Sequence, residues 1–378
     1  MQEGQSRPLR IGLDATCTCH GYRAIRRYAV NLIRQLVKQS QQHQYRLLRV
    51  NPRSQWILSD VRDPSLVLCD TRIPARILYP LWHRLAIPSV ETFTGALDVF
   101  HATDMELPTT SRRVPMIWTV HGLNYVARPD LMQEGYVEKA TGWLELAVRR
   151  CAHFIAVSQH TAHMLQERYP QVAGRVTAIP LGVGEEFKPE GPASDLVDRP
   201  YILFVGAVAA VKNVGTLVQA YGVLRDRTKV PHRLVLVGAV DKAYWKRIMP
   251  ARYVDDVVLL GHLDQDASGL PKLYRGADAF AFPSYSEGWT SPPLEAMASG
   301  VPVVTSNASS LPETVGDGAL MVDPDDVDAL ASTLDRLIHD QGLRQSMVEK
   351  GLRHAAAFTW ERMAQATTQV YEQVASAR

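Results

Sequence analysis

Short runs of β-branched and aromatic residues alternate with stretches of helical periodicity along almost the whole chain. Parallel strands need a crossover between them, usually a helix, so this alternation predicts the α/β class with parallel sheets. In the first half we predict strands at Leu9–Asp14, Tyr45–Val50, Leu97–His101, Pro115–Val120, Phe154–Val157 and Val176–Ile179. In the second half we predict strands at Tyr201–Val205, Arg233–Val237, Val257–Leu260, Ala279–Phe282 and Val301–Thr305.

The alternation stops between Gly184 and Pro200, where the chain is polar and rich in proline and glycine, as a linker would be. A chain of 378 residues is long enough for two domains of ordinary size. We therefore predict two Rossmann-like parallel-sheet domains, over residues 1–190 and 191–358, followed by a last helix over residues 359–378.

The basic residues are concentrated at the front of the chain. Residues 1–90 contain 14 Lys and Arg against 5 Asp and Glu, whereas the net charge of the whole chain is +2. One predicted helix carries five of these cations, namely Arg23, Arg26, Arg27, Arg34 and Lys38. Such a face suits a phosphate group or an anionic lipid at a peripheral membrane contact, or it is simply solvated. Because no DNA-reading motif or aromatic-interleaved basic surface is found, nucleic acid is not an expected partner.

The longest uncharged apolar run, Tyr201–Val211, is far shorter than the ~20 residues of a membrane-spanning helix. The polar residues that begin the sequence do not form the apolar core of a signal peptide. The expected location is therefore the cytoplasm, including the inner face of the membrane.

In open parallel sheets, ligands bind beyond the carboxyl ends of the strands, so the residues that follow each strand are informative. After the strand Tyr201–Val205 the chain has Gly206, then Lys212 and Asn213, and then a helix. A glycine, a lysine and a helix N-terminus in this order suit a phosphate group. The alternative is a tight turn before an ordinary helix, because neither dinucleotide nor P-loop patterns are matched.

Two carboxylates eight residues apart follow the strand Ala279–Phe282. Glu287 is expected on the loop and Glu295 in the short helix after it, so both side chains can point into one crevice. Glu295 lies among apolar residues and needs a partner if it is buried, and a hydroxyl-rich ligand would supply one. Asp264-Gln265-Asp266 and Asp323-Pro324-Asp325 have the spacing of a metal motif, but we interpret them as loop and helix-cap residues and predict no metal.

These positions belong to a longer series of motifs that resembles one family, the retaining family 4 glycosyltransferases of the GT-B fold. In that fold two Rossmann-like domains face a cleft. The resemblance extends from Ile11 to about Trp360. The motifs are Ile11-Gly12-Leu13-Asp14, Arg27-Tyr28, Asn31-Leu32, Thr119-Val120-His121-Gly122-Leu123, Ile155-Ala156-Val157-Ser158, Ile179-Pro180-Leu181-Gly182, Phe204-Val205-Gly206, Lys212-Asn213, Glu287-x7-Glu295 and Leu311-Pro312-Glu313.

The resemblance implies a hexosyltransferase with a nucleotide-sugar donor, GDP-mannose or a UDP-sugar, held mainly by the second domain. A glycan or lipid-linked saccharide acceptor would lie on the first domain, against which the last helix would pack, and no cofactor is implied. The implied catalytic residues are His121 facing the donor sugar, Lys212 at the diphosphate and Glu287 near the reacting carbon. The implied donor-binding residues are Gly12 in a turn near the phosphates, His262 and Leu263 at the nucleobase and Glu295 at the ribose, together with Gly206, Asn213, Gly288, Trp289 and Thr290. Arg26, which departs from the family pattern, is a further candidate as a cation at the donor.

The chain departs from the family pattern at three places. Ala24 and Arg26 replace the two glycines that usually precede Arg-Tyr, so a side chain stands where close backbone approach is usual. Ala207 occupies the position of a frequent phosphate-binding arginine, and Trp289-Thr290 replaces the usual Phe-Gly. These departures motivate an alternative hypothesis, a catalytically silent nucleotide-sugar-binding subunit that partners an active transferase.

Overall fold

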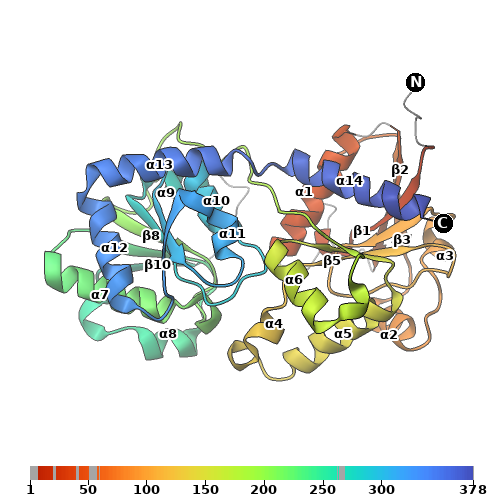
Figure 1. Cartoon of the computed structure of the whole chain (residues 1–378), viewed down its shortest axis with the longest axis horizontal. Coiled ribbons are helices and arrows are strands. Elements are labelled where there is room, and N and C mark those ends of the chain that lie inside the picture. Colours follow the sequence, from red (N-terminus) through yellow and green to blue (C-terminus); the bar gives the residue numbers. More distant parts are fainter. Residues whose placement is uncertain are drawn as a thin grey trace. The chain divides into compact units, whose positions relative to one another are not determined.

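The computed structural model describes residues 7–19, 23–39, 42–50, 58, 60–261, 263 and 269–377. The chain divides into two compact units (Figure 1). The first unit consists of Met1–Val126, Gln133–Leu181 and Trp360–Arg378, and the second of Ala127–Met132 and Gly182–Thr359. Each unit is built on one parallel sheet with helices, which confirms the predicted α/β class. Within the described residues, no helix is long and apolar enough to cross a membrane.

The sheet of the first unit has seven parallel strands in the order β3-β2-β1-β4-β5-β6-β7. The strands are β1 (Arg10–Asp14), β2 (Gln44–Val50), β3 (Leu66–Thr71), β4 (Val99–Ala102), β5 (Met116–Val120), β6 (His153–Ala156) and β7 (Val176–Ala178). Six of them were predicted. The seventh, β3, is an edge strand whose Val67 and Leu68 are exposed, so it lacks the buried pattern that marks a central strand.

The helices of the first unit are α1 (Arg23–Gln39), α2 (Ala75–Arg84), α3 (Glu91–Thr94), α4 (Asn124–Ala127), α5 (Tyr136–Arg150), α6 (Gln159–Arg168) and α14 (Trp360–Ser376), with 3-10 turns η1 (Thr16–Thr18) and η3 (Pro170–Val172). Between α4 and α5, the 3-10 turn η2 (Pro129–Leu131) belongs to the second unit. Ser158 caps α6 by accepting a hydrogen bond from the Thr161 amide.

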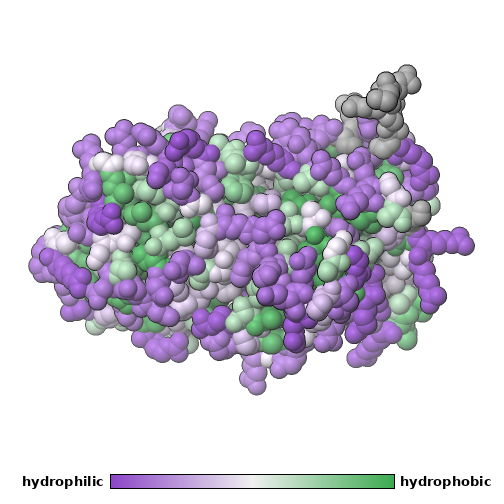
Figure 2. Space-filling model, viewed as in Figure 1, coloured by the Kyte–Doolittle hydropathy of each residue, from purple (hydrophilic) through white to green (hydrophobic). Residues whose placement is uncertain are grey.

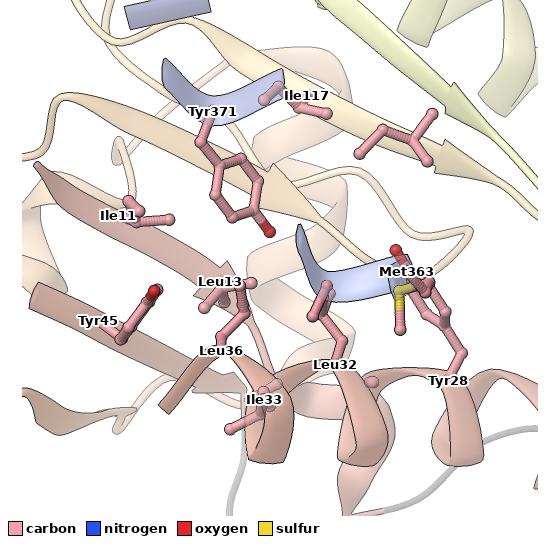
Figure 3. Packing of buried hydrophobic residues seen from close by; sticks show 14 of the residues in the cluster. Ile11, Leu13, Tyr28, Leu32, Ile33, Leu36, Tyr45, Ile117, Met363 and Tyr371 are labelled. Atoms are coloured by element: carbon pink, nitrogen blue, oxygen red, sulfur yellow. The ribbon is translucent and has the colours of Figure 1, made fainter. Parts of the chain in front are cut away.

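The last helix of the chain completes the core of the first unit. Helix α14 packs against α1, and side chains of both helices join those of β1 in one buried cluster. Figure 3 shows this cluster from close by, with Tyr28, Leu32, Ile33 and Leu36 of α1, Ile11 and Leu13 of β1, and Met363 and Tyr371 of α14. The apolar face of α1 is therefore buried between the sheet and the last helix.

Four buried polar groups connect α1, β5, β4 and α14 in one chain of hydrogen bonds. The Tyr28 hydroxyl lies 2.9 Å from Thr119 Oγ1, which lies 2.7 Å from His101 Nε2. His101 Nδ1 lies 2.6 Å from the Tyr371 hydroxyl. Burial lowers the pKa of His101 to about 3, so its ring is neutral and donates from one nitrogen while it accepts at the other.

The sheet of the second unit has six parallel strands in the order β10-β9-β8-β11-β12-β13. The strands are β8 (Tyr201–Val205), β9 (Arg233–Val237), β10 (Val257–Gly261), β11 (Ala279–Phe282), β12 (Val303–Ser306) and β13 (Ala319–Val322). Five of these strands were predicted. Strand β13 was missed because its four residues, Ala-Leu-Met-Val, are too few to show whether their periodicity is that of a strand or of a helix.

The helices of the second unit are α7 (Val214–Thr228), α8 (Lys242–Ile248), α9 (Gly269–Gly276), α10 (Ser291–Ala298), α11 (Leu311–Val315), α12 (Val327–His339) and α13 (Gln341–Ala355). Short 3-10 turns lie at η4 (Ala210–Lys212), η5 (Ala251–Tyr253) and η6 (Gly316–Gly318). The backbone is tightly packed where β8 and β9 end. A Cβ atom at Gly238 would lie 2.0 Å from the Gly206 carbonyl oxygen, so only glycine fits there.

Asp14, at the carboxyl end of β1, is completely buried. Its Oδ1 accepts a hydrogen bond from the Thr16 amide, and its Oδ2 has no hydrogen-bond partner among the described residues. Burial raises the pKa of Asp14 to about 7 although the hydrogen bonds from Thr16 oppose this, and the charges of Asp104 and Glu106 add to the rise.

This carboxyl group predicts a pH-dependent stability. Between about pH 4 and about pH 7, folded Asp14 keeps a proton that the unfolded chain has released, so the free energy of unfolding falls as pH rises. A shift of about three units corresponds to about 4 kcal/mol. Asp14→Asn keeps the Oδ1 acceptor and cannot ionise. In urea unfolding at about pH 5 and about pH 8, the variant should gain stability relative to the wild type at the higher pH. Equal pH slopes would contradict this.

The polar network predicts a second effect on stability. Tyr371→Phe removes the hydroxyl that pairs with His101 and leaves a buried ring nitrogen without its partner. The expected loss is about 1–3 kcal/mol in the free energy of unfolding, measured by urea titration. Tyr169→Phe, at a half-buried position after α6, is the matched control and should change the midpoint little. A Tyr371→Phe protein as stable as this control would show that the network contributes nothing.

Candidate functional site

Lys212 and Glu287, two of the predicted site residues, form an ion pair in the second unit. Lys212 is the last residue of η4 after β8, and Glu287 lies on the loop after β11, the strand next to β8. The Lys212 ammonium donates hydrogen bonds of 2.6 and 2.7 Å to the two oxygens of Glu287. The lysine side chain is 22% exposed and the glutamate 5% exposed. The pair is therefore fixed at the carboxyl edge of the sheet with only the lysine open to solvent.

Serine hydroxyls that the sequence analysis did not single out hold Glu287 in place. Ser284 Oγ donates to Glu287 Oε1 at 2.6 Å. The Glu287 amide donates to Ser309 Oγ, and Ser310 Oγ donates to the Glu287 carbonyl. Ser306 Oγ in turn donates to the Ser284 carbonyl, so the loop after β11 is bound to the loop after β12. The concentration of serines after both strands is the sequence signal for this arrangement.

Glu295 lies in α10 and is completely buried. Its Oε2 accepts a hydrogen bond of 2.9 Å from the hydroxyl of Tyr274 in α9. The partner expected from a hydroxyl-rich ligand is thus supplied, at least for one oxygen, by the protein. Tyr274 was missed because its position on the apolar face of α9 is typical of a core residue.

The predicted phosphate-binding segment after β8 is well ordered by its own hydrogen bonds. The Gly206 amide donates to the Val237 carbonyl, so it is occupied within the sheet and is not available to a phosphate. Asn213 has a left-handed backbone conformation, and its side-chain amide donates to the Pro324 carbonyl. At the start of α7, the Gly215 amide donates to the Tyr244 hydroxyl. Among the predicted phosphate-binding groups of this segment, the Lys212 ammonium remains partly exposed.

The remaining predicted donor-binding residues of the second unit differ in exposure. Trp289 and Thr290 are buried, and the Trp289 ring lies 5.3 Å from the ring of Phe358. The Trp289 indole N–H has no hydrogen-bond partner among the described residues. Gly288 is buried beside them, and Leu263 is half-buried. His262 lies outside the described residues.

The first unit contains the other predicted site residues. His121 follows β5, and its Nε2 lies 2.7 Å from the Thr103 carbonyl oxygen. A carbonyl only accepts, so Nε2 carries the proton. Burial lowers the pKa of His121, although the Thr103 carbonyl and Asp104 act to raise it, so the neutral ring has its lone pair on Nδ1. The His121 ring meets the Tyr28 ring edge-on at 5.0 Å.

Gly12 and Arg26 both lie in regular elements of the first unit. Gly12 does not lie in a turn: it is in the middle of β1, paired with Arg46 and Phe100. A Cβ atom there would lie 2.5 Å from the Phe100 ring, so packing within the sheet explains this glycine and the expected turn is wrong. Arg26 lies in α1 and is half-buried, and its Nε has no hydrogen-bond partner among the described residues.

In the described part of the chain, no group of three His, Cys, Asp or Glu side chains is arranged to hold a metal ion. Asp323 accepts from the Asp325 amide within a turn, and Asp326 caps α12 by accepting from the Ala329 amide. Asp264 and Asp266 lie outside the described residues.

Two family models match the chain in succession. Residues 25–187 match the model described as Glycosyltransferase Family 4, and residues 189–354 match the model described as Glycosyl transferases group 1. An O-antigen chain mannosyltransferase B of Escherichia coli is 28% identical over 309 residues, which are 79% of this chain and 78% of that protein. A D-inositol 3-phosphate glycosyltransferase of Salinispora arenicola is 29% identical over 70% of this chain and 64% of its own length.

The fold is also found among solved structures. Sucrose-phosphate synthase from Thermosynechococcus elongatus superposes with a TM-score of 0.72 over 98% of this chain and 100% of its own, at 21% identity. This likeness confirms the GT-B type of architecture predicted from the motifs. The two consecutive models together account for nearly the whole chain, and the chain therefore belongs to the family 4 glycosyltransferases.

Proposed function

We propose that this protein transfers a hexose from a nucleoside diphosphate sugar to a growing glycan or a lipid-linked saccharide. Transfer would retain the anomeric configuration and need no divalent metal. The similarity to an O-antigen mannosyltransferase supports mannose, carried by GDP, as the hexose. A UDP-sugar is the second donor class to be tested. In this proposal the second unit holds the donor and the first unit holds the acceptor.

The observation that carries the proposal is the Lys212–Glu287 pair. An ammonium has three N–H groups, and two of them are directed to the Glu287 oxygens. The third is left for an oxygen of the donor diphosphate. Breaking the bond between the anomeric carbon and the phosphate places negative charge on the departing diphosphate. A cation already held in position stabilises this charge more in the transition state than in the bound donor.

The two carboxylates would have different tasks. Glu287 would face the sugar, where positive charge develops on the anomeric carbon, and Ser284 and Ser309 already fix its side chain and backbone. Glu295 would accept hydrogen bonds from the ribose hydroxyls. Its carboxylate is completely buried and already accepts a hydrogen bond from Tyr274 in the free protein, so a ribose would have to join or replace the partners that the protein supplies.

His121 would accept a hydrogen bond from a hydroxyl of the donor sugar. Its Nε2–H is committed to the Thr103 carbonyl, so the lone pair on Nδ1 is the group that can meet a hydroxyl. The lowered pKa keeps the ring neutral at neutral pH, which suits an acceptor and not a cation.

A panel of nucleotides tests the proposed donor. Thermal unfolding of the full chain would be followed with GDP, GDP-mannose, UDP, UDP-glucose and ADP. A ligand at a hundred times its Kd stabilises the folded state by about 2.7 kcal/mol, so the matching nucleotide should raise the Tm and the others should not. A Tm that no diphosphate nucleotide changes would contradict the proposal.

Lys212 is predicted to act on the chemical step. With the correct donor, Lys212→Ala should lower kcat by about 30- to 1000-fold, since a preorganised charge contact to a leaving group contributes ~2–4 kcal/mol. Lys242→Ala, at an exposed position in α8, is the control and should leave the rate unchanged. Because the substitution also removes the cation that pairs with the buried Glu287, it can lower stability, so the Tm of the variant must be measured together with the rate. A folded Lys212→Ala protein with the wild-type rate would remove the central role assigned to this residue.

A further inference from the structure

Exposed apolar side chains of the described residues gather in one segment of the first unit. Nine large apolar residues are exposed in the described part of the chain, and five of them fall between residues 67 and 87. These five are Val67 and Leu68 on β3, Ile77 on α2, and Leu85 and Ile87 just after α2. The other four are scattered over the second unit. Such a concentration on one part of the surface is typical of a contact site.

Helix α2 has one buried and one exposed side. Leu78 and Trp82 are buried on the inner side. Arg76, Ile77, Pro80 and Arg84 are exposed, and Pro80 lies three or four residues from each of the others, the spacing that places side chains on one helix face. Figure 2 has the same view as Figure 1. At the lower right, in the region where Figure 1 labels α2, hydrophobic and hydrophilic residues lie side by side on the surface.

The segment after α2 is fixed, so its apolar side chains are held in solvent. The Trp82 indole N–H donates to the Pro88 carbonyl at 2.6 Å. The Arg150 guanidinium donates to the carbonyls of Trp82 and His83. Leu85 is 61% exposed and Ile87 57% exposed within this frame. Exposure of two large apolar side chains costs free energy that burial in an apolar medium would recover.

Within this segment the charged side chains are all basic, and a half-buried acid of the first unit, Glu106, lies 3.6 Å from His83 of α2. Arg72, Arg76 and Arg84 are exposed, and the sequence from Thr71 to Val90 contains no Asp or Glu. The acid just before this stretch, Asp70, accepts two hydrogen bonds of 2.6 Å from Arg49 and is neutralised by it. The adjoining loop, joined by the bond from the Val90 amide to the Thr109 carbonyl, adds exposed Arg112 and Arg113.

We propose that this surface, the α2 patch formed by Arg72, Arg76, Ile77, Arg84, Leu85 and Ile87, docks the protein on an anionic lipid bilayer. The three apolar side chains enter the boundary between headgroups and acyl chains, and the arginines bind lipid phosphates. A bilayer fits this surface better than a second copy of the chain, because self-association through the patch would bring arginines against arginines.

The basic face of α1, considered in the sequence analysis, is a weaker candidate for the same role. The Arg27 guanidinium lies over the Trp360 ring at 5.9 Å, inside the contact between α1 and α14. Arg34 pairs with Asp60 at 3.1 Å. These two cations have partners within the protein, and the described residues of α1 include no exposed large apolar side chain that could insert.

Vesicle sedimentation of the full chain tests the proposal. Vesicles of phosphatidylcholine alone are compared with vesicles that also contain phosphatidylglycerol. One variant replaces the apolar group (Ile77→Ser, Leu85→Ser, Ile87→Ser), and a second replaces the basic group (Arg72→Gln, Arg76→Gln, Arg84→Gln). The matched controls are Leu196→Ser, an exposed apolar residue of the second unit, and the α1 variant Arg34→Gln, Lys38→Gln.

The wild type should sediment with the anionic vesicles, and high salt should release it. Loss of three arginines should lower the partition constant by about 100-fold, at about fivefold for each cation near the surface. The apolar variant should also lose binding, and both controls should bind as the wild type does. All the changed residues are exposed, so an unchanged Tm is expected and is checked first.

A wild type that does not sediment, or patch variants that bind as well as it does, would overturn the proposal. Loss of a wild-type dimer in the patch variants without vesicle binding would assign the patch to self-association instead.

Discussion

The packing of the last helix against the first is the contact on which the first unit depends. Helix α14 is separated from α1 by more than 300 residues of sequence, yet its Met363 and Tyr371 lie in the same buried cluster as Tyr28. Without it, the apolar side of α1 and a neutral buried histidine would face water. The chain must therefore leave the first unit after Leu181 and return at Trp360. The two connecting segments pair with each other through Val183 and Thr359.

The sequence was most informative where burial and local chemistry agree. The central strands of both sheets are apolar on both faces, and they were predicted close to their observed bounds. The Ser158 hydroxyl that caps α6 is likewise a local signal, because a capping residue lies next to the helix that it caps. The two missed strands, β3 and β13, are sheet edges. An edge strand is covered on one side only, so its sequence carries a weaker pattern. The other two edge strands, β7 and β10, were predicted because each begins with β-branched residues.

For the candidate site, the sequence predicted which residues lie at the strand ends but not what they touch. Lys212 and Glu287 were predicted to share a site, and the structure brings their charges into contact. Tyr274 and Glu295 belong to separate helices, and such a pairing has no fixed sequence spacing. Ser284 and Glu287 lie three residues apart on one loop, but a loop has no regular periodicity that would predict their hydrogen bond. At Gly12 the sequence led to a wrong prediction. The glycine is required because Phe100 on the neighbouring strand leaves no room for a side chain, but in the sequence it cannot be told from a glycine that a turn requires.

The discontinuity of the first unit has a consequence for how the protein is made. A ribosome releases the N-terminal strands long before the helix that covers them, because residues 182–359 are synthesised in between. The second unit is nearly contiguous and can fold as soon as it emerges, whereas the first must wait with part of its apolar surface open. Partly covered sheets of this kind are the species that aggregate or need chaperones. A truncation or fusion that disturbs residues 360–376 would therefore first lower the yield of soluble protein. The part that fails to fold would be the first unit, although most of its residues lie at the opposite end of the sequence.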